Sequence, residues 1–333
     1  MFRNLKRTAR WPAIAVAIGL VCSSQTVAKK PPKPPEDEPV TYTLVELSSI
    51  EGWAGAINQL DGFVEVVGVF YDYSGEDVVH RARYWTVDPA GNVLGLDLQT
   101  LPPSEPEAIV SSQALDVNND GTVVGSQWGD SAGTAPLLWP DATKPPTKLP
   151  LPEGTVGFAS SINDEGIVLG LAYDPDNPDN GVSLVVWKTA VVDGVAMVLD
   201  SKTLLTKAGP YRMQVTNSGY ACATVNVSTD PEIYEYRALR LMLDWNDDQV
   251  WEVPGSRTQL FDDWSTANGV NEAGTVCGRC APPGGGWGIA FAMTVSGELL
   301  DLPVLPAVKK KGFTYTAADN EEAMALNLAL IHI

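Results

Sequence analysis

Residues 116–125 read D-V-N-N-D-G-T-V-V-G, and a polar gap separates them from the run A-P-L-L-W at residues 135–139. Asn-x-x-Gly between two apolar runs is typical of a hairpin turn, because Asn tolerates the left-handed backbone region and Gly enters it freely. The Val-Val-Gly run predicts a buried strand whose glycine permits a bulge or a close approach of neighbouring sheets. These residues therefore predict two strands joined by a tight turn, and a third strand that ends on Trp139.

The same phrase returns along the chain, which makes this a repeat protein. In successive copies the asparagine position is filled by Asn58, Asn118, Asn163, Thr216, Asn271 and, in a weaker sixth copy, Asn320. The steps between these positions are 60, 45, 53, 55 and 49 residues. This spacing is typical of one propeller blade per copy, whereas solenoid repeats are usually shorter and more uniform.

Each copy continues into a third strand and a fourth. Trp85, Trp139 and Trp187 fall at one repeat position, so we expect them in the core between blades. Proline in or just after the following run indicates an outermost strand, because proline is tolerated at sheet edges and strand ends. The expected outermost strands are residues 94–98, 148–151, 196–199, 250–253 and 299–302.

The two ends of the repeat region complement each other. Residues 42–47 form an alternating run that predicts a fourth strand without a sheet, and the last copy stops short of its own fourth strand. Combining the two would close a ring and protect the sheet edges. The sequence therefore predicts an all-β fold over residues 41–333, a β-propeller of four-stranded antiparallel sheets. Six blades are the expected number, with five or seven as alternatives.

The phrase A-x-x-I-N-x-x-G-x-V-V-G, followed by a strand like A-F-x-W, resembles the HAF family of extracellular repeats from exported bacterial proteins. The resemblance covers most of residues 42–300 and departs from the family at Thr216, where Asn is expected, and at Leu241 and Met293, where Trp is expected. The family implies export and a repeat fold. It carries no established activity, so it supplies no catalytic residues.

The first 28 residues predict a cleaved signal peptide. Four cations between Arg3 and Arg10 precede an apolar run over residues 11–21, which is too short to span a bilayer, and Thr26-Val-Ala28 is an acceptable cleavage site. Lipoprotein processing at Cys22 is the alternative. Residues 29–40 form a charged, proline-rich linker. We therefore expect a periplasmic, cell-surface or extracellular protein without an integral membrane segment in the mature chain.

The chain of 333 residues is 44% hydrophobic and carries a formal charge of −19, which becomes −23 when the four signal-peptide cations leave. Such an acidic surface repels phosphates and argues against nucleic acid as a partner. An extracellular or periplasmic protein or glycan remains the expected partner, and we expect a monomer.

Three cysteines remain in the mature chain, Cys222, Cys277 and Cys280, and they are disulfide candidates for an exported protein. Cys277 and Cys280 form a CxxC that lacks the second pair of a zinc site.

No catalytic constellation is evident. His80 and His332 are the two histidines, and neither lies in a recognisable triad setting. Carboxylates are too common for spacing to identify a glycosidase pair.

Asp116, Asn118 and Asp120 place oxygen ligands at alternate positions before Gly121, like the start of a calcium loop, but Gln127 stands where an EF-hand needs Glu. Calcium is thus a weak prediction against a solvated hairpin tip, and no other cofactor is expected.

Four tryptophans lie outside the repeated phrase and are candidates for stacking on a sugar or peptide: Trp53, Trp128, Trp264 and Trp287. Trp287 follows three glycines, an unusual loop that lacks the strand, helix and lysine of a nucleotide cradle. The leading functional hypothesis is an exported binding or scaffolding module without catalysis. The alternatives are a secreted carbohydrate-active hydrolase or lyase that uses Asp and Glu, and a calcium-stabilised structural repeat.

Overall fold

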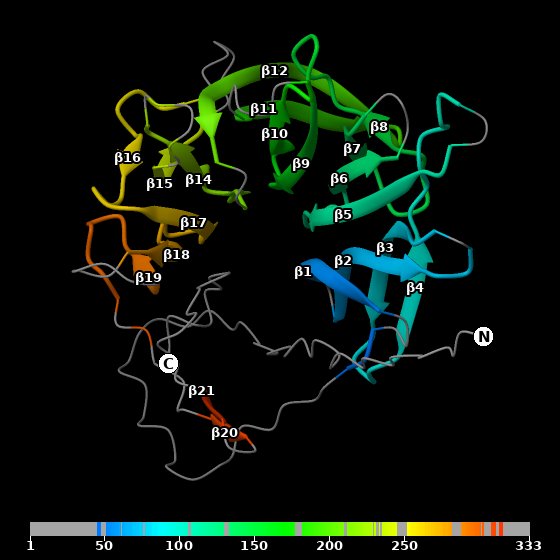
Figure 1. Ribbon diagram of the computed structural model, residues 1–333. Coiled ribbons are helices and arrows are strands. Elements are labelled where there is room, and N and C mark those ends of the chain that lie inside the picture. Colours follow the sequence, from blue (N-terminus) through cyan, green and yellow to red (C-terminus); the bar gives the residue numbers. More distant parts are fainter. Residues whose placement is uncertain are drawn as a thin grey trace, which may run out of the picture.

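The computed structural model describes residues 45–47, 51–60, 62–75, 77–105, 108–129, 133–176, 182–209, 212–228, 230, 233, 235–244, 252–281, 288–300, 302, 308–310 and 313–315. Every regular element within these ranges is a β-strand, which confirms the all-β prediction. The strands form antiparallel sheets that follow an arc about a common centre (Figure 1). They are grouped here into blades, one for each repeat copy, and the third and fourth blades share one eight-stranded sheet. The first strand of each blade lies nearest that centre.

The blades follow the repeat copies in chain order. Blade 1 contains β1 (Gly52–Leu60), β2 (Phe63–Asp72), β3 (Val79–Val87) and β4 (Val93–Asp97), and blade 2 contains β5 (Ser111–Val117), β6 (Val123–Trp128), β7 (Ala135–Trp139) and β8 (Thr147–Lys148). Blade 3 contains β9 (Val156–Ile162), β10 (Ile167–Tyr173), β11 (Val182–Val192) and β12 (Val195–Ala208). Blade 4 contains β13 (Gln214–Val215), β14 (Tyr220–Asn226), β15 (Tyr236–Met242) and β16 (Thr258–Gln259), and blade 5 contains β17 (Ser265–Val270), β18 (Val276–Cys280) and β19 (Ile289–Met293). A separate pair, β20 (Val308–Lys310) and β21 (Phe313–Tyr315), follows blade 5.

A bulge in the first strand explains the glycine of the Val-Val-Gly run. In blade 2 the pairing register shifts between Ala114 and Asp116, opposite Gly125. A Cβ atom on Gly125 would lie 2.0 Å from the carbonyl oxygen of Gln113, a separation that real atoms do not reach. The same clash excludes a side chain at the equivalent glycines of blades 1, 3 and 5, which are Gly68, Gly170 and Gly278. Of the two alternatives that the sequence left open for this glycine, the structure shows a bulge, which lies in the first strand opposite the glycine.

Blade 4 departs from this rule because its first strand is short. β13 pairs only with Ala221 and Cys222 of the second strand. Ala223, which occupies the position of Gly125, pairs with Leu239 of β15 and has no partner in β13. The first-strand carbonyl that would clash with a side chain in the other blades is therefore not paired opposite Ala223. Alanine can therefore replace glycine in this copy.

The outermost strands confirm some of the expected ranges and correct others. Strands β4, β8 and β12 overlap the ranges expected for blades 1 to 3. The range 250–253 is wrong, since residues 252–253 form no strand and the outermost strand is β16. Ser256 N donates to Val253 O at 3.0 Å, so the chain turns at Pro254 and Gly255 before it pairs with β15. Near 299–302, Leu299 forms a single bridge with Met293.

The hydrophobic core lies between blades rather than within them. One buried cluster joins Val124 and Leu138 of blade 2 to Val168 and Trp187 of blade 3, and three similar clusters join the other neighbouring blades. Trp85, Trp139 and Trp187 are all buried, as expected from their common repeat position. Full burial of such a side chain stabilises the fold by roughly 1.5–3 kcal/mol, so each joint depends on its tryptophan or its replacement.

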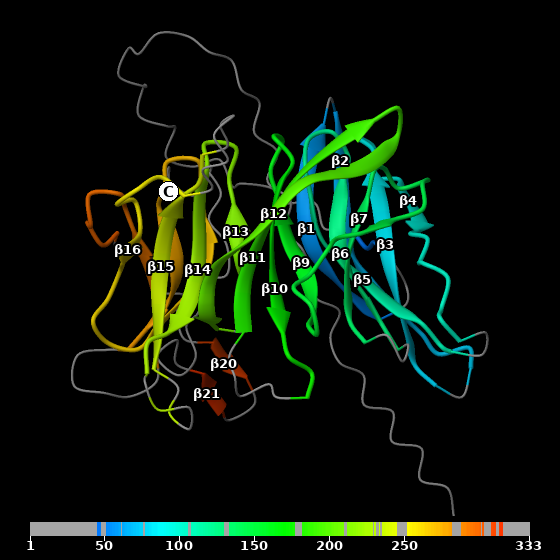
Figure 2. The same ribbon diagram turned by 90° about the horizontal axis from the view of Figure 1, so that it is seen from above.

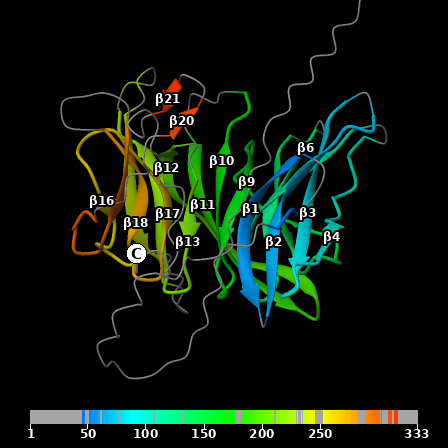
Figure 3. The same cartoon turned by 90° about the horizontal axis from the view of Figure 1, so that it is seen from below.

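The described strands leave the arc open. No sheet among the described residues joins blade 5 to blade 1. Of the strand expected at 42–47, residues 45–47 are described and form no strand, and the rest lies outside the described ranges. Figures 2 and 3 show the blades from the side, with their strands running between two ends of the molecule.

Candidate functional site

The two ends of the blades differ in character. We call the end that carries the turns between first and second strands the asparagine edge, because the repeated asparagine begins the turn in blades 2, 3 and 5. We call the opposite end, which carries the connections between second and third strands, the loop edge. Three of the tryptophan candidates lie at the loop edge, whereas the calcium candidates lie at the asparagine edge.

The repeated asparagines link neighbouring blades in one direction. Nδ2 of Asn58 donates to the carbonyl oxygen of Asn118 at 3.0 Å, Asn118 donates to Asn163 at 3.2 Å, and Asn163 donates to Thr216 at 3.0 Å. The other side-chain atom of Asn118, Oδ1, accepts from the backbone of Asp120 and Thr122 in its own turn. One amide therefore closes its own hairpin and binds the next one. We call this series the asparagine ladder.

Asp116 belongs to a second ladder beside the first. Its Oδ2 accepts from Ser161 Oγ at 2.7 Å and from the backbone N of Ile162 at 2.9 Å, both in blade 3. The residues at its repeat position act alike, since Ser161 Oγ accepts from Val215 N at 3.1 Å and Gln214 Oε1 accepts from Val270 N at 3.0 Å. The pKa of Asp116 is raised to about 6, chiefly because its carboxylate is enclosed, although the residue as a whole is partly exposed.

These contacts give the predicted calcium ligands other partners. The oxygens of Asp116 bind blade 3 and the N–H of Val117, and Oδ1 of Asn118 binds its own turn. Asp120 is exposed at the hairpin tip. Within the described ranges, no group of three or more His, Cys, Asp or Glu side chains gathers as a metal site would require. A bound cation at this turn would have to compete with the hydrogen bonds that join blades 2 and 3.

The three cysteines are core residues, and the structure contains no disulfide among them. Cys277 and Cys280 lie three residues apart on β18, so their side chains point to opposite faces of the sheet and cannot hold one ion together. Burial raises the pKa of all three thiols, that of Cys277 to about 12. Such thiols are poor nucleophiles and poor metal ligands at neutral pH.

The tryptophan candidates lie apart in different blades. Trp53 is near the start of β1, Trp128 ends β6, and Trp264 precedes β17, all partly buried at the loop edge. The guanidinium of Arg279 lies 5.9 Å from the Trp264 ring. Trp287 lies outside the described residues. The structure thus assigns the three described tryptophans to one end of the molecule but does not bring them into a single cluster.

Trp128 belongs to an aromatic row that the sequence did not reveal. The row runs from Tyr73 through Tyr71 and His80 to Trp128, with ring centroids 6.4, 4.8 and 5.4 Å apart. Tyr71 and His80 are direct cross-strand partners on β2 and β3, and Trp128 comes from blade 2. Tyr73 is 54% exposed, so the row leads from the joint between blades to the surface. His80, rather than acting in a triad, packs between two rings.

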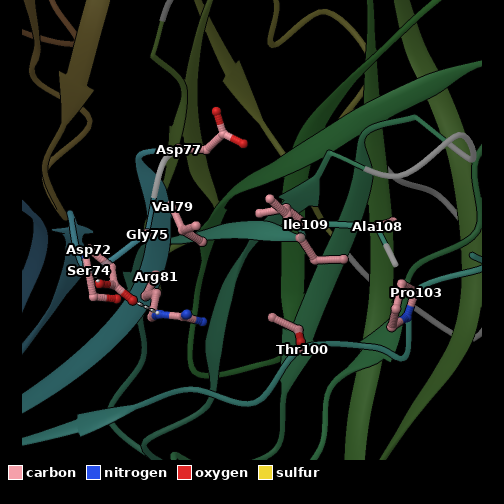
Figure 4. Close-up of a pocket in the computed structure, with 11 residues that line it drawn as sticks. Asp72, Ser74, Gly75, Asp77, Val79, Arg81, Thr100, Pro103, Ala108 and Ile109 are labelled. Carbon is pink, nitrogen blue, oxygen red and sulfur yellow. Dashed lines mark hydrogen bonds and ion pairs between the residues drawn. The ribbon is translucent and has the colours of Figure 1, made fainter. Parts of the chain in front are cut away.

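A pocket with a volume of about 600 Å³ lies at the same end, between the strand ends of blade 1 and the segment that leads into blade 2. In Figure 4, Asp72, Ser74 and Arg81 lie together on one side, with Pro103, Ala108 and Ile109 on the other. The remaining lining residues are Gly75, Asp77, Val79, Thr100 and Val110. The pocket therefore combines one polar wall with one largely apolar wall.

The polar wall is held by an ion pair. Arg81 Nε donates to Asp72 Oδ2 at 2.9 Å, and the backbone N of Ser74 donates to Asp72 Oδ1 at 3.0 Å. The hydrogen bonds from Ser74 and then from Arg81 lower the pKa of Asp72 to about 2. Asp72 is therefore ionised at neutral pH and cannot act as a general acid there. It can accept hydrogen bonds, and Arg81 can donate them.

No protein-family model and no curated protein matches this sequence. Among solved structures, the chain is similar to an acylaminoacyl peptidase from Pyrococcus horikoshii, with a TM-score of 0.41 and 10% identity over 80% of this chain. The match spans 42% of that peptidase, so the chain corresponds to less than half of it. It is also similar to the β-propeller domain of the Trilobed protease from Pyrococcus furiosus, described as having an open velcro topology, with a TM-score of 0.37 and 9% identity over 81% of this chain and 78% of that one. A third match is a glycosyl hydrolase from Bacteroides ovatus, with a TM-score of 0.31 and 14% identity over 68% of this chain and 74% of that one. We infer no activity from similarities of this size.

Proposed function

We propose that this protein is a binding or scaffolding module without catalysis, and that its ligand binds at the loop edge beside blades 1 and 2. The observation that carries the proposal is the pocket there, with the Asp72–Arg81 ion pair on one side and apolar side chains on the other. Sites for neutral ligands commonly combine an apolar surface with a few placed polar groups. Hydroxyl-rich glycans and peptides have the matching chemistry.

The composition of the pocket favours binding over turnover. A two-carboxylate glycosidase needs one carboxyl group that remains protonated as an acid. Asp72 is ionised, and its partner Arg81 occupies one of its oxygens, so the role of the acid could fall only to Asp77, the other carboxylate of the lining. The neighbouring aromatic row ends in the exposed ring of Tyr73, which offers a surface for stacking on a sugar or a peptide side chain.

A glycan and peptide array, followed by calorimetry on any hit, tests this function. Arg81→Ala should weaken binding of a hit at least tenfold, because it removes a donor and leaves Asp72 without its partner. Arg257→Ala is the matched control, since Arg257 pairs with Glu252 in blade 4, away from the pocket, and loses the same charge. Cleavage of the hit by the wild-type protein, or equal loss of binding in both variants, contradicts the proposal.

We also propose that the mature protein is exported and monomeric. The basic, apolar and small-residue parts of residues 1–28 support export, as does the resemblance to HAF repeats. Mass spectrometry of the mature N-terminus distinguishes the two modes of processing. A free amine at Lys29 fits signal-peptide cleavage, whereas a lipid-modified Cys22 identifies a lipoprotein.

We propose, finally, that the blades belong to a ring of six. Five repeat copies correspond to the five blades, and a further copy of the phrase is expected beyond blade 5. A closed ring would cover the edges that the open arc leaves exposed. In this arrangement the N-terminal and C-terminal segments share the sixth blade.

A further inference from the structure

The forward end of the arc has an amide donor without an acceptor. Asn271 begins the turn of blade 5, and its Oδ1 accepts from the backbone of Ala273 and Thr275, as Asn118 Oδ1 accepts from the backbone of its own turn in blade 2. The residue is 5% exposed, and its Nδ2 is buried without a hydrogen-bond partner among the described residues. The equivalent atoms of Asn58, Asn118 and Asn163 each donate to the turn of the next blade. A buried amide that lacks an acceptor destabilises the fold, so an acceptor is expected there.

At the other end of the arc, in blade 1, one apolar side chain is uncovered and one buried N–H group has no acceptor among the described residues. The residue before the asparagine, or before Thr216 in blade 4, is 6%, 5%, 4% and 1% exposed at Val117, Ile162, Val215 and Val270, because the preceding blade covers it. In blade 1 the equivalent Ile57 is 48% exposed. Nε1 of Trp139 and Trp187 donates to the carbonyl of Gln99 and Pro150, just beyond the outermost strand of the preceding blade. Nε1 of Trp85 is buried without such a partner in the described chain.

The strand registers identify which segment can cover the forward end. In four blades the first strand ends in the order alanine, bulge, any residue, apolar residue, asparagine: Ala54–Asn58, Ala114–Asn118, Ala159–Asn163 and Ala267–Asn271. Residues 323–327 read A-M-A-L-N and match this order at its three constrained positions, the alanine, the apolar residue and the asparagine. The step from Asn271 to Asn327 is 56 residues, within the range of 45 to 60 between the earlier copies. The copy centred on Asn320 lacks both the alanine four residues earlier and the apolar residue before it.

We propose that residues 323–327 form the first strand of the closing blade and dock on blade 5, with the carbonyl oxygen of Asn327 accepting from Nδ2 of Asn271. This inference rests on the six-bladed ring proposed above and replaces its sixth copy at Asn320. Leu326 then takes the position of Val270 and packs against blade 5. On the other side of the closing blade, Asn327 donates to the carbonyl of Asn58 and the blade covers Ile57, so the ladder becomes continuous.

A pair of leucine substitutions in the mature full-length chain tests the assignment. Leu326→Asp puts a charge at the buried position and should lower the melting temperature by about 5–10 °C. Leu328→Asp is the matched control, because the residue after the asparagine is exposed or nearly so in every described copy, from Gln59 to Glu272. It should change the melting temperature by less than about 2 °C. Equal effects of the two substitutions overturn the assignment.

The substitution Asn271→Asp tests the ring closure independently of the assignment to residues 323–327. The carboxylate keeps the acceptor of the turn and loses the donor, so it should lower the melting temperature by about 3–6 °C if Nδ2 donates to a carbonyl. Gln59→Glu, an exposed amide at the same edge, provides the control for the added charge. If Asn271→Asp destabilises while the two leucine variants are alike, the ring closes through another segment and the assignment to 323–327 is wrong. If Asn271→Asp behaves like its control, Nδ2 has no acceptor and the docking is wrong.

Hydrogen exchange on the wild-type protein gives an independent result. Amides of residues 323–327 should exchange as slowly as those of residues 114–118, because both would be first strands in the same setting. A synthetic peptide with the sequence of residues 321–333 supplies the reference for unprotected amides. Exchange of 323–327 in the protein at the rate of the peptide contradicts the proposed strand.

Discussion

Blade 2 and blade 4 are built from the same repeat, yet they meet their neighbours in different ways. Blade 2 has the full phrase, with Asn118 in its turn and Gly125 opposite the bulge, whereas blade 4 has Thr216 and Ala223 at these positions. Thr216 cannot reach the next turn with an amide. Instead Ser218 Oγ donates to Glu272 O at 2.8 Å, and the Glu272 carboxylate accepts from the backbone of Asn217 and Ser218. A bond between neighbouring turns is kept even though the asparagine is lost.

Two parts of the repeated phrase, the glycine and the asparagine, therefore have separate structural roles. The glycine is required where a bulged first strand presses its carbonyl against the second strand, and it is lost where that strand is two residues long. The asparagine is required for a bond between turns, and other side chains can replace it. Four substitutions test this comparison, in order of decreasing expected effect.

Gly125→Ala should have the largest effect. Its Cβ would lie 2.0 Å from Gln113 O and cannot be accommodated without moving the bulge, so we expect a loss of about 3–5 kcal/mol in the free energy of unfolding. The reverse change in blade 4, Ala223→Gly, should cost at most about 1–1.5 kcal/mol, from backbone entropy and the loss of a buried methyl. Denaturant unfolding measures both. Similar losses at the two sites would mean that the bulge does not explain the glycine.

Asn118→Ala should follow at about 2–4 kcal/mol. It removes the acceptor for two N–H groups of its own turn and the donor to the Asn163 carbonyl, and the bonds to Thr122 and Asn163 are buried. Thr216→Ala removes bonds to Ser218 and Tyr220 within one turn and leaves the Ser218–Glu272 contact to blade 5 in place. It should cost about 1 kcal/mol. Thermal unfolding of the two variants would give equal shifts if the ladder contributed nothing.

Asp116→Asn should change the pH dependence of stability, because Gln214 performs the same role in blade 4 without a charge. The folded pKa of Asp116, about 6, exceeds its ordinary value of 3.8. The contribution of the protonated Asp116 to the free energy of unfolding is therefore fully present below pH 3.8 and is lost as the pH rises through 6. Between pH 7.5 and 4.5, the wild type should gain about 1–3 kcal/mol relative to the variant.

Urea unfolding at the two pH values measures this difference. Asp120→Asn, at the exposed tip of the same turn, removes the same charge and should show no such gain. A pH dependence that is equal in both variants would show that Asp116 is not the group responsible.

Thr216→Asn should give the smallest effect, and in the stabilising direction. It restores the amide that could donate to the carbonyl of Asn271, at the cost of the Thr216 hydroxyl bonds in its own turn. A gain of about 0.5–1 kcal/mol is expected, measured as a rise in melting temperature. A loss of stability would show that the Ser218–Glu272 contact has fixed a geometry in which asparagine no longer fits.

Much of the fold could be predicted from the sequence, because the repeated phrase recurs at a spacing typical of propeller blades. The turn, the buried second strand and the buried tryptophans follow from Asn118, Val124 and Trp139 and their equivalents. The outermost strand of blade 4 could not be placed, since Pro254 and Gly255 precede that strand instead of following it. Proline indicates a strand boundary, but it does not say on which side the strand lies.

The candidate site was harder to predict. Trp128 was recognised as a residue outside the repeat, yet its partners Tyr71 and His80 come from another blade, and their contact depends on how the blades pack. The alternating oxygen ligands before Gly121 predict Asp116 as a calcium ligand. Its true partners, Ser161 and Ile162, lie 45 and 46 residues away and became apparent only from the register between blades.

The asparagine ladder also bears on how such a protein can evolve. Each asparagine donates to a backbone carbonyl, which every residue possesses, so the bond does not depend on which blade follows. Blades could be duplicated, deleted or exchanged without breaking this edge, provided that the turn keeps its shape. The order of the blades must then be encoded in the apolar surfaces between them. The loop edge, which takes no part in the ladder, is free to diversify toward new ligands.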